Sequence, residues 1–239
     1  MLTSIRTFED VLAGNYWTFP EETALISNYS KVFENGKMGR FFLNSLIITL
    51  PTVFGTLFLS SLAGYSLAMH RFKLNLLVFA MFIAGNFVPF QILMIPVRNI
   101  SIEMGMYNTH LGLIIFHIAF QTGFCTFFLR NFIKELPFEL IEAARADGAT
   151  EWTIYRKIIL PLIIPALAAL GVLEFTFIWN DYFWALVLTQ GDSVKPITVG
   201  LDVLRGQWTT SWNLVSAGSV VAALPVSYTH LTLPTILLV

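Results

Sequence analysis

The sequence predicts an all-helical integral membrane protein, and composition, hydropathy and segment length carry that prediction. Hydrophobic residues make up 56% of the 239 residues and charged residues 12%, against about 45–50% and about 25% in soluble domains. Mean hydropathy is +0.70. This composition excludes a cytosolic enzyme and a disordered chain, and a net charge of −1 excludes a nucleic-acid binder. Cys125 is the single cysteine, so an internal disulfide is excluded too.

Five segments are long and apolar enough to cross a bilayer, whose core of about 30 Å needs about 20 helical residues. Pro89 interrupts the second segment, and Pro161 and Pro165 lie near the start of the fourth. The fifth is the weakest, because prolines and a histidine interrupt it. We expect spans over Phe41–Met69, Leu74–Pro96, Leu111–Leu129, Ile158–Ile178 and Leu214–Val239.

Residues 1–40 are polar, aromatic and loop-like, and they lack the charged start and apolar core of a secretory signal. We expect an extracytoplasmic surface segment that leads into the first span. Basic residues are equally numerous on the two sides, but they are densest in the loop over residues 130–157. Because cytoplasmic loops are enriched in Lys and Arg, we place this loop in the cytoplasm.

Small residues lie at four-residue spacing on one face of the first span: Thr56, Ser60, Gly64 and Ala68. Lipid supplies no hydrophobic drive between helices, so membrane helices meet where small side chains allow close approach. We therefore expect a helix–helix contact along this face.

The loop over residues 130–157 predicts a short helix outside the membrane. Pro137 suits a first helical turn, and Phe138, Ile141 and Ala144 recur at helical spacing. Gly148 stands where a helix stops, since glycine enters the left-handed conformation without steric cost. The result is a helix of about ten residues, roughly 15 Å long.

Neighbouring residues add three local expectations. Glu142 and Arg145 can pair at three-residue spacing. Thr150 can cap a following helix over Glu151–Leu160. The apolar edge of the short helix suits a groove on another protein, or else a position on lipid headgroups. The pattern by itself favours neither alternative.

The loop resembles the EAA loop of binding-protein-dependent ABC importer permeases. Glu142-Ala143-Ala144 is followed after three residues by Gly148, and after nine more by Ile158, Leu160 and Pro161. Further segments are similar to the carbohydrate, maltose-type branch of that family: residues 44–45, 89–96, 136–141, 145–150 and 179–181. The similarity runs from about residue 28 to about residue 225.

The resemblance implies a type I ABC importer permease fold in a bacterial inner membrane, among lipids. The EAA helix would dock on a separate cytoplasmic ATPase, and two ATPases would move two permease subunits by alternating access. An extracytoplasmic binding protein would deliver a sugar or oligosaccharide. The chain has no phosphate-loop pattern, in keeping with ATP bound by partner subunits, no cofactor here and no enzyme activity.

Three other functions stay open at this stage. One is an ABC permease for another polar solute, such as a polyamine or peptide. A second is a stand-alone secondary transporter with Glu174 as its ion site, although such folds carry inverted repeats that are not evident here. A third is a non-transporting membrane scaffold.

The resemblance also implies roles for loop residues. Glu142 would anchor the helix through its charge, and Ala143 and Ala144 would allow close approach. Gly148 would set the turn that aims the helix. Asp147 would brace that turn, unless it is an ordinary solvated loop acid.

Two departures from the family pattern concern the ends of the chain. The family usually has six spans, and a helix before residues 1–40 is missing. We expect permease sequence over residues 41–225 and an atypical tail over Val226–Val239, which suggests an incomplete chain.

Candidate solute-path residues follow from polarity inside or beside the fourth span. Glu174 lies 16 residues beyond Ile158, about 24 Å along a straight helix, and it either lines the path or pairs with a neighbouring helix. Asn180 and Asp181 could bind sugar hydroxyls, but we favour a helix end, with Trp179 as an interfacial anchor. His110 and His117 lack further ligands at suitable spacing, so we expect no metal site.

Overall fold

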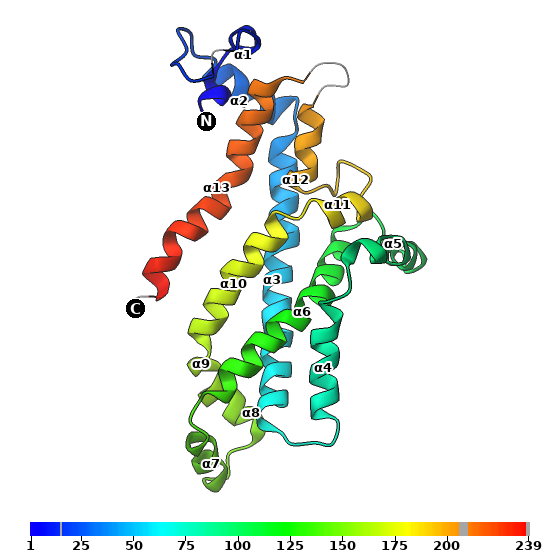
Figure 1. Ribbon diagram of the computed structural model, residues 1–239, viewed down its shortest axis with the longest axis vertical. Helices are drawn as coiled ribbons and strands as arrows, with labels where there is room; N and C mark the ends of the chain where they lie inside the picture. Colours follow the sequence, from blue (N-terminus) through cyan, green and yellow to red (C-terminus); the bar gives the residue numbers. More distant parts are fainter. Residues whose placement is uncertain (15, 206–209, 238–239) are drawn as a thin grey trace. The chain divides into compact units, whose positions relative to one another are not determined.

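The computed structural model describes residues 1–14, 16–205 and 210–237, with the backbone alone from residue 230 onward. Every element in this part of the chain is helical, and its one β pairing is an isolated bridge between Arg205 and Thr210. The predicted all-α class is therefore confirmed (Figure 1).

The elements follow one another in the order drawn in Figure 1. Most are α-helices; η1, η2 and η4 are 3-10 turns, and η3 is a π-helical turn. Their bounds are η1 Leu2–Ile5, α1 Phe8–Leu12, α2 Leu25–Glu34, α3 Met38–Met69, α4 Asn75–Gly85, η2 Phe90–Leu93, α5 Met94–Glu103, α6 His110–Lys134, α7 Glu139–Ala146, α8 Glu151–Ile154, η3 Tyr155–Ile159, α9 Leu160–Leu162, α10 Ile164–Trp179, α11 Phe183–Leu188, α12 Ile197–Gly200, η4 Leu201–Leu204 and α13 Trp212–Leu237.

The chain forms two compact units, and α3 and α6 each contribute residues to both. Unit 1 comprises Met1–Thr49, Arg98–Leu113 and Trp179–Thr232. Unit 2 comprises Leu50–Val97, Ile114–Ile178 and Leu233–Val239.

In unit 1, buried amide side chains hold the N-terminal segment. The Asn28 amide donates to the carbonyl oxygens of Ser4 and Arg6 at 3.0 and 2.8 Å, and the Asn213 amide donates to Asn28 Oδ1 at 3.0 Å. The expectation of a loop-like segment over residues 1–40 is therefore wrong, since η1, α1, α2 and the start of α3 lie within it. The tertiary partner Asn213, 185 positions away, supplies contacts that local sequence does not reveal.

In unit 2, two members of the stripe of small residues on α3, Ser60 and Gly64, contact α6. Thr56 and Ser60 are fully buried, and Ser60 Oγ donates to the Thr122 carbonyl oxygen at 3.3 Å. A Cβ on Gly64 would lie 3.2 Å from Leu129 Cβ. The predicted helix–helix contact is confirmed.

Within the part of the chain that the structure describes, two helices, α3 and α6, are long and apolar enough to cross a membrane. Two bent pairs, Asn75–Gly85 with Phe90–Glu103 and Glu151–Leu162 with Ile164–Trp179, pass the same test, which makes up to four spans if each pair is one span. Within the described residues α13 is not among them. The fifth expected span, Leu214–Val239, coincides with α13 and ends in residues 238–239, which lie outside the description.

Both bends occur at prolines that the sequence singles out. The first pair turns by 88° around Pro89, and the second by 70° at Ile163. Proline offers no N–H to the carbonyl four residues earlier, so Pro161 and Pro165, two residues before and after Ile163, each remove one ladder bond. The fourth expected span is therefore not one straight helix.

Candidate functional site

Helix α7 is the short helix that the loop predicts, and it has eight residues. Ile141 is 1% exposed and packs in an apolar cluster of unit 2 with Ile133 and Ile154, and Ala144 packs against the same cluster. The chain's own core covers Ile141, so the expected insertion into another protein is wrong for this residue, while Ala144 is only half-buried against the same core. Phe138, just before α7, stays about half exposed.

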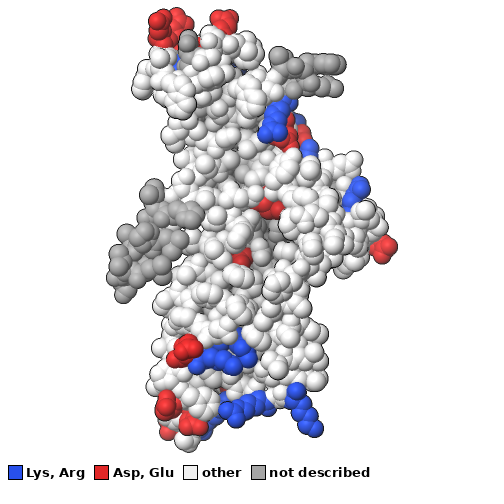
Figure 2. Space-filling model, in the orientation of Figure 1, with Lys and Arg blue, Asp and Glu red and all other residues white. Residues whose placement is uncertain are grey.

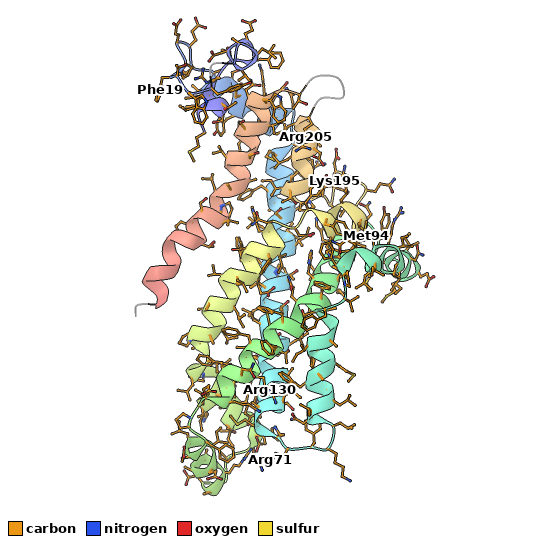
Figure 3. All side chains as sticks on the ribbon, viewed as in Figure 1. Phe19, Arg71, Met94, Arg130, Lys195 and Arg205 are labelled. Carbon is orange, nitrogen blue, oxygen red and sulfur yellow. The ribbon has the colours of Figure 1, made fainter. Side chains whose placement is uncertain are left out.

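Most of the EAA residues lie on the other face of α7 or directly after its end. Glu142, Ala143, Asp147 and Gly148 are exposed, and Ala144 is half-buried. Figure 1 draws α7 at one end of unit 2, where Figure 2 shows acidic and basic side chains gathered. Arg71 and Arg130 lie toward the same end in Figure 3. The structure thus presents a charged, accessible helix whose inner side is fixed by packing.

Gly148 closes α7 in the left-handed conformation, with φ +78°. Its N–H donates to the Arg145 carbonyl at 3.0 Å, and the Ala149 N–H donates to the Ala144 carbonyl at 3.0 Å. These two bonds are those of the Schellman C-cap. A Cβ at Gly148 would meet no atom within 4 Å, so backbone conformation and not space requires glycine. The predicted helix stop is confirmed.

Thr150 caps the next helix as predicted, because its Oγ1 accepts from the Thr153 N–H at 3.3 Å. The helical run that follows extends over α8, η3 and α9 to Leu162, slightly beyond the expected Leu160. Glu142 is only a minor electrostatic partner of Arg145, and the main partner is another acid. Arg145 Nε donates instead to Glu151 Oε1 at 2.9 Å. That hydrogen bond is the main reason why the pKa of Arg145 is raised.

The Glu151 carboxylate accepts two hydrogen bonds and has a histidine beside it, an arrangement that the sequence did not reveal. Besides Arg145, the Tyr65 hydroxyl donates to Oε2 at 2.6 Å, and His70 Nε2 lies 3.3 Å from the same oxygen. In sequence, Glu151 is an ordinary acid in a first helical turn. Tyr65 lies 86 positions earlier, on α3. No local pattern links the two residues.

Glu174 is fully buried in unit 2, and it pairs with a neighbouring helix, as one of its two interpretations expects. Cys125 Sγ of α6 donates to Oε1 at 3.1 Å, while Oε2 has no hydrogen-bond partner among the described side chains. The distance of about 24 Å from Ile158 assumed a straight helix, and the 70° bend at Ile163 invalidates it.

Trp179, Asn180 and Asp181 belong to unit 1. Helix α10 ends at Trp179, and the Asp181 carboxylate accepts from the backbone N–H groups of Trp184 and Ala185, so the predicted helix end is confirmed. Trp179 is 1% exposed, and its Nε1 donates to the Ala222 carbonyl at 2.9 Å. The prediction that Trp179 is an interfacial anchor is therefore wrong. Asn180 is exposed.

Among the described residues, no group of three or more His, Cys, Asp or Glu side chains could hold a metal ion. His110, one of the two histidines considered, instead shares a 3.0 Å hydrogen bond with Asn44 Oδ1.

Fold and site together define a polytopic helical membrane protein with a rigidly capped helix outside its apolar segments. The family described as "Binding-protein-dependent transport system inner membrane component" matches residues 56–238. The chain belongs to this family, which confirms the resemblance drawn from the EAA loop. Its members are permease components, so the expectation that this chain is not an enzyme is confirmed as well.

Curated relatives and solved structures agree with this family. The chain is 34% identical over 234 residues to the melibiose/raffinose/stachyose import permease protein MelC of Bacillus subtilis (strain 168), covering 98% of this chain and 84% of that protein. It is 35% identical over 227 residues to the osmoprotective compounds uptake permease protein GgtD of Synechocystis sp., covering 92% and 76%.

A bacterial ABC transporter involved in the import of the acidic polysaccharide alginate contains a chain of the same fold. Its TM-score is 0.86 at 22% identity, with 98% of this chain and 87% of that chain covered. At this identity the match establishes the type I ABC importer permease fold alone.

Proposed function

We propose that this chain is a permease subunit that carries sugars or oligosaccharides into the cell by alternating access. Its family is that of binding-protein-dependent transport, and relatives such as MelC are named for sugar import. In the complete importer it would assemble with a second permease subunit, two cytoplasmic ATPases and an extracytoplasmic binding protein.

Helix α7 is the contact with the ATPase in this proposal, and its geometry is the observation that carries it. The helix is exposed on the side of Glu142 and Ala143, and it is held on the other side by buried Ile141. A projecting helix transmits force only if its base cannot yield, and the apolar cluster and the Gly148 cap supply that rigidity. Asp147, exposed beside the cap, belongs to the same contact.

The spans and the solute path complete the proposal. Counting each bent pair as one span and adding α13 yields five spans, with α7 in the cytoplasm. Of the candidate path residues, exposed Asn180 is the one most open to a solute. Asp181 accepts two helix N–H groups, and Glu174 is buried against Cys125, so both have structural roles in addition.

Co-purification of the cognate ATPase with the tagged permease from membranes tests the coupling role. Changing Glu142→Ala and Gly148→Val together should abolish capture, because both the anchoring charge and the helix turn are lost. Glu135→Ala is the matched control, an exposed acid outside α7. Full capture by the double variant would exclude α7 as the ATPase contact.

A further inference from the structure

One carboxylate connects the exposed helix α7 to the long helix α3. Glu151 Oε1 accepts from Arg145 Nε of α7 at 2.9 Å, and Oε2 accepts from the Tyr65 hydroxyl of α3 at 2.6 Å. Both are hydrogen bonds to an ionised acceptor, the stronger and shorter kind. Glu151 itself begins α8, so three helices meet at this one side chain.

Packing holds the α3 end of this connection in one orientation. Tyr65 is 5% exposed, and its ring lies 5.5 Å from that of Tyr155 and edge-on to His70 at 5.6 Å. A ring enclosed on these sides cannot swing to follow a moving partner. Displacement of the Glu151 carboxylate therefore either breaks the Tyr65 hydrogen bond or moves the end of α3 with it.

Stability alone does not account for the convergence of donors. Arg145 and Glu151 are 34% and 46% exposed, and ion pairs at such exposure contribute little to folding. Buried Ile141 already fixes the inner side of α7, and the Gly148 cap already ends the helix. What the hydrogen bonds of Arg145 and Tyr65 to Glu151 add is a defined geometry between α7 and α3.

We propose that Glu151 is a positioning residue that transmits displacement of α7 to α3 through Arg145 and Tyr65. The inference rests on the proposed docking of the ATPase at α7 and adds the route inward from it. When α7 moves, the ion pair with Arg145 displaces Glu151. The hydrogen bond from the buried Tyr65 hydroxyl to Glu151 then displaces the end of α3. We call this arrangement of Arg145, Glu151 and Tyr65 the relay.

The relay is tested in the complete importer, reconstituted in proteoliposomes with both permeases, the ATPases and the binding protein. Ser66, exposed and next to Tyr65, is changed to cysteine and labelled with bimane, whose fluorescence reports local environment. The signal is the fluorescence change on adding Mg-ATP with vanadate. Background labelling of this chain is small, because its native cysteine, Cys125, is buried.

Tyr65→Phe removes the hydroxyl and keeps the ring. We expect the nucleotide-driven change to fall by at least about fivefold, the lower end of ordinary coupling between sites, while the ATPase still co-purifies and hydrolyses ATP. Tyr155→Phe is the matched control, because it deletes a buried hydroxyl of the same cluster that bonds Ser61 at 2.7 Å and not Glu151. It should keep the full signal.

Combination with Glu151→Ala separates transmission from general destabilisation. If the two residues act in one relay, Tyr65→Phe with Glu151→Ala loses no more signal than either change alone. Independent losses that multiply would overturn the relay. An equal signal in Tyr65→Phe and Tyr155→Phe would overturn it too. Loss of ATPase capture in Tyr65→Phe would also overturn it, because the hydrogen bonds would then only maintain the shape of the docking face.

The failure of the relay and that of the proposed function are distinguishable. If the unmodified chain does not capture the ATPase, docking at α7 is wrong and the relay with it. If capture persists in the Tyr65 and Glu151 variants and the signal does not depend on Tyr65, docking stands and the relay alone is wrong.

Discussion

A Cβ on Gly64 of α3 would lie 3.1 Å from the backbone nitrogen of Arg130 on α6. That distance is tighter than ordinary van der Waals contact, and a backbone atom cannot rotate away as a side chain can. Glycine at this position therefore determines how closely the two helices approach, in the manner expected of membrane helix contacts.

Gly64→Ala should destabilise the protein by about 1–3 kcal/mol, because overpacking forces the helices apart. Gly171→Ala on α10 is the matched control, since its Cβ would meet Leu57 Cδ1 at an ordinary 3.4 Å. Thermal unfolding of the purified protein in detergent measures both. Equal midpoints would contradict the close approach at Gly64.

Gly148→Val should abolish ATPase capture while the protein still inserts into the membrane. The left-handed backbone at φ +78° costs a residue with a side chain about 1–2 kcal/mol, and the turn that aims α7 is lost with it. Gly148→Asn should keep most of the capture, because asparagine tolerates this conformation.

Gly105 supplies the control for that strain. It has φ +66° and equally open surroundings, and it belongs to unit 1, whereas α7 belongs to unit 2. Gly105→Val should retain capture in the same co-purification. A comparable loss of ATPase capture in both valine variants would show that backbone strain at either site is enough to prevent capture, and that the turn after α7 has no special role.

Thr150→Ala should expose the start of α8. Its hydroxyl satisfies the Thr153 N–H, and loss of such a cap costs about 1 kcal/mol, so that amide should exchange with solvent about fivefold faster. Thr150→Ser keeps the acceptor and should exchange like the parent. Hydrogen exchange with mass spectrometry of the 150–160 segment reads out both variants, and unchanged exchange in Thr150→Ala would refute the cap.

Asp192 should contribute to stability in a pH-dependent way. The pKa of its carboxyl is lowered by hydrogen bonds from Lys37 and then Lys195, so the folded pKa lies below the unfolded value. The contribution is therefore complete above the unfolded pKa of about 4 and is lost as pH falls through the folded pKa. Lys37 and Asp192 are 51% and 35% exposed, which limits it to about 1 kcal/mol.

Asp192→Asn should thus lower the melting temperature slightly at pH 7 and not at pH 3. Melting curves of parent and variant across that range test the sign. A melting-temperature difference between parent and variant that grows as the pH falls would contradict the predicted direction.

Much of this protein follows from sequence alone, because the interactions concerned are local. Composition determines a helical membrane protein, and the EAA spacing determines the family. Gly148 and Thr150 end and begin helices through bonds to neighbours within five residues, so their roles were predictable from their positions. The prolines marked where two spans break, although not by what angle.

Only the tertiary structure decided which side chains meet across long stretches of chain. Glu142 and Arg145 looked like a pair, but Glu151 competes for the guanidinium and brings Tyr65 from 86 positions away. Trp179 looked like an interfacial anchor, but the Ala222 carbonyl accepts from its indole nitrogen inside unit 1. A side chain's partner depends on which helices pack together, and hydrophobic pattern specifies that a face is buried without specifying against what.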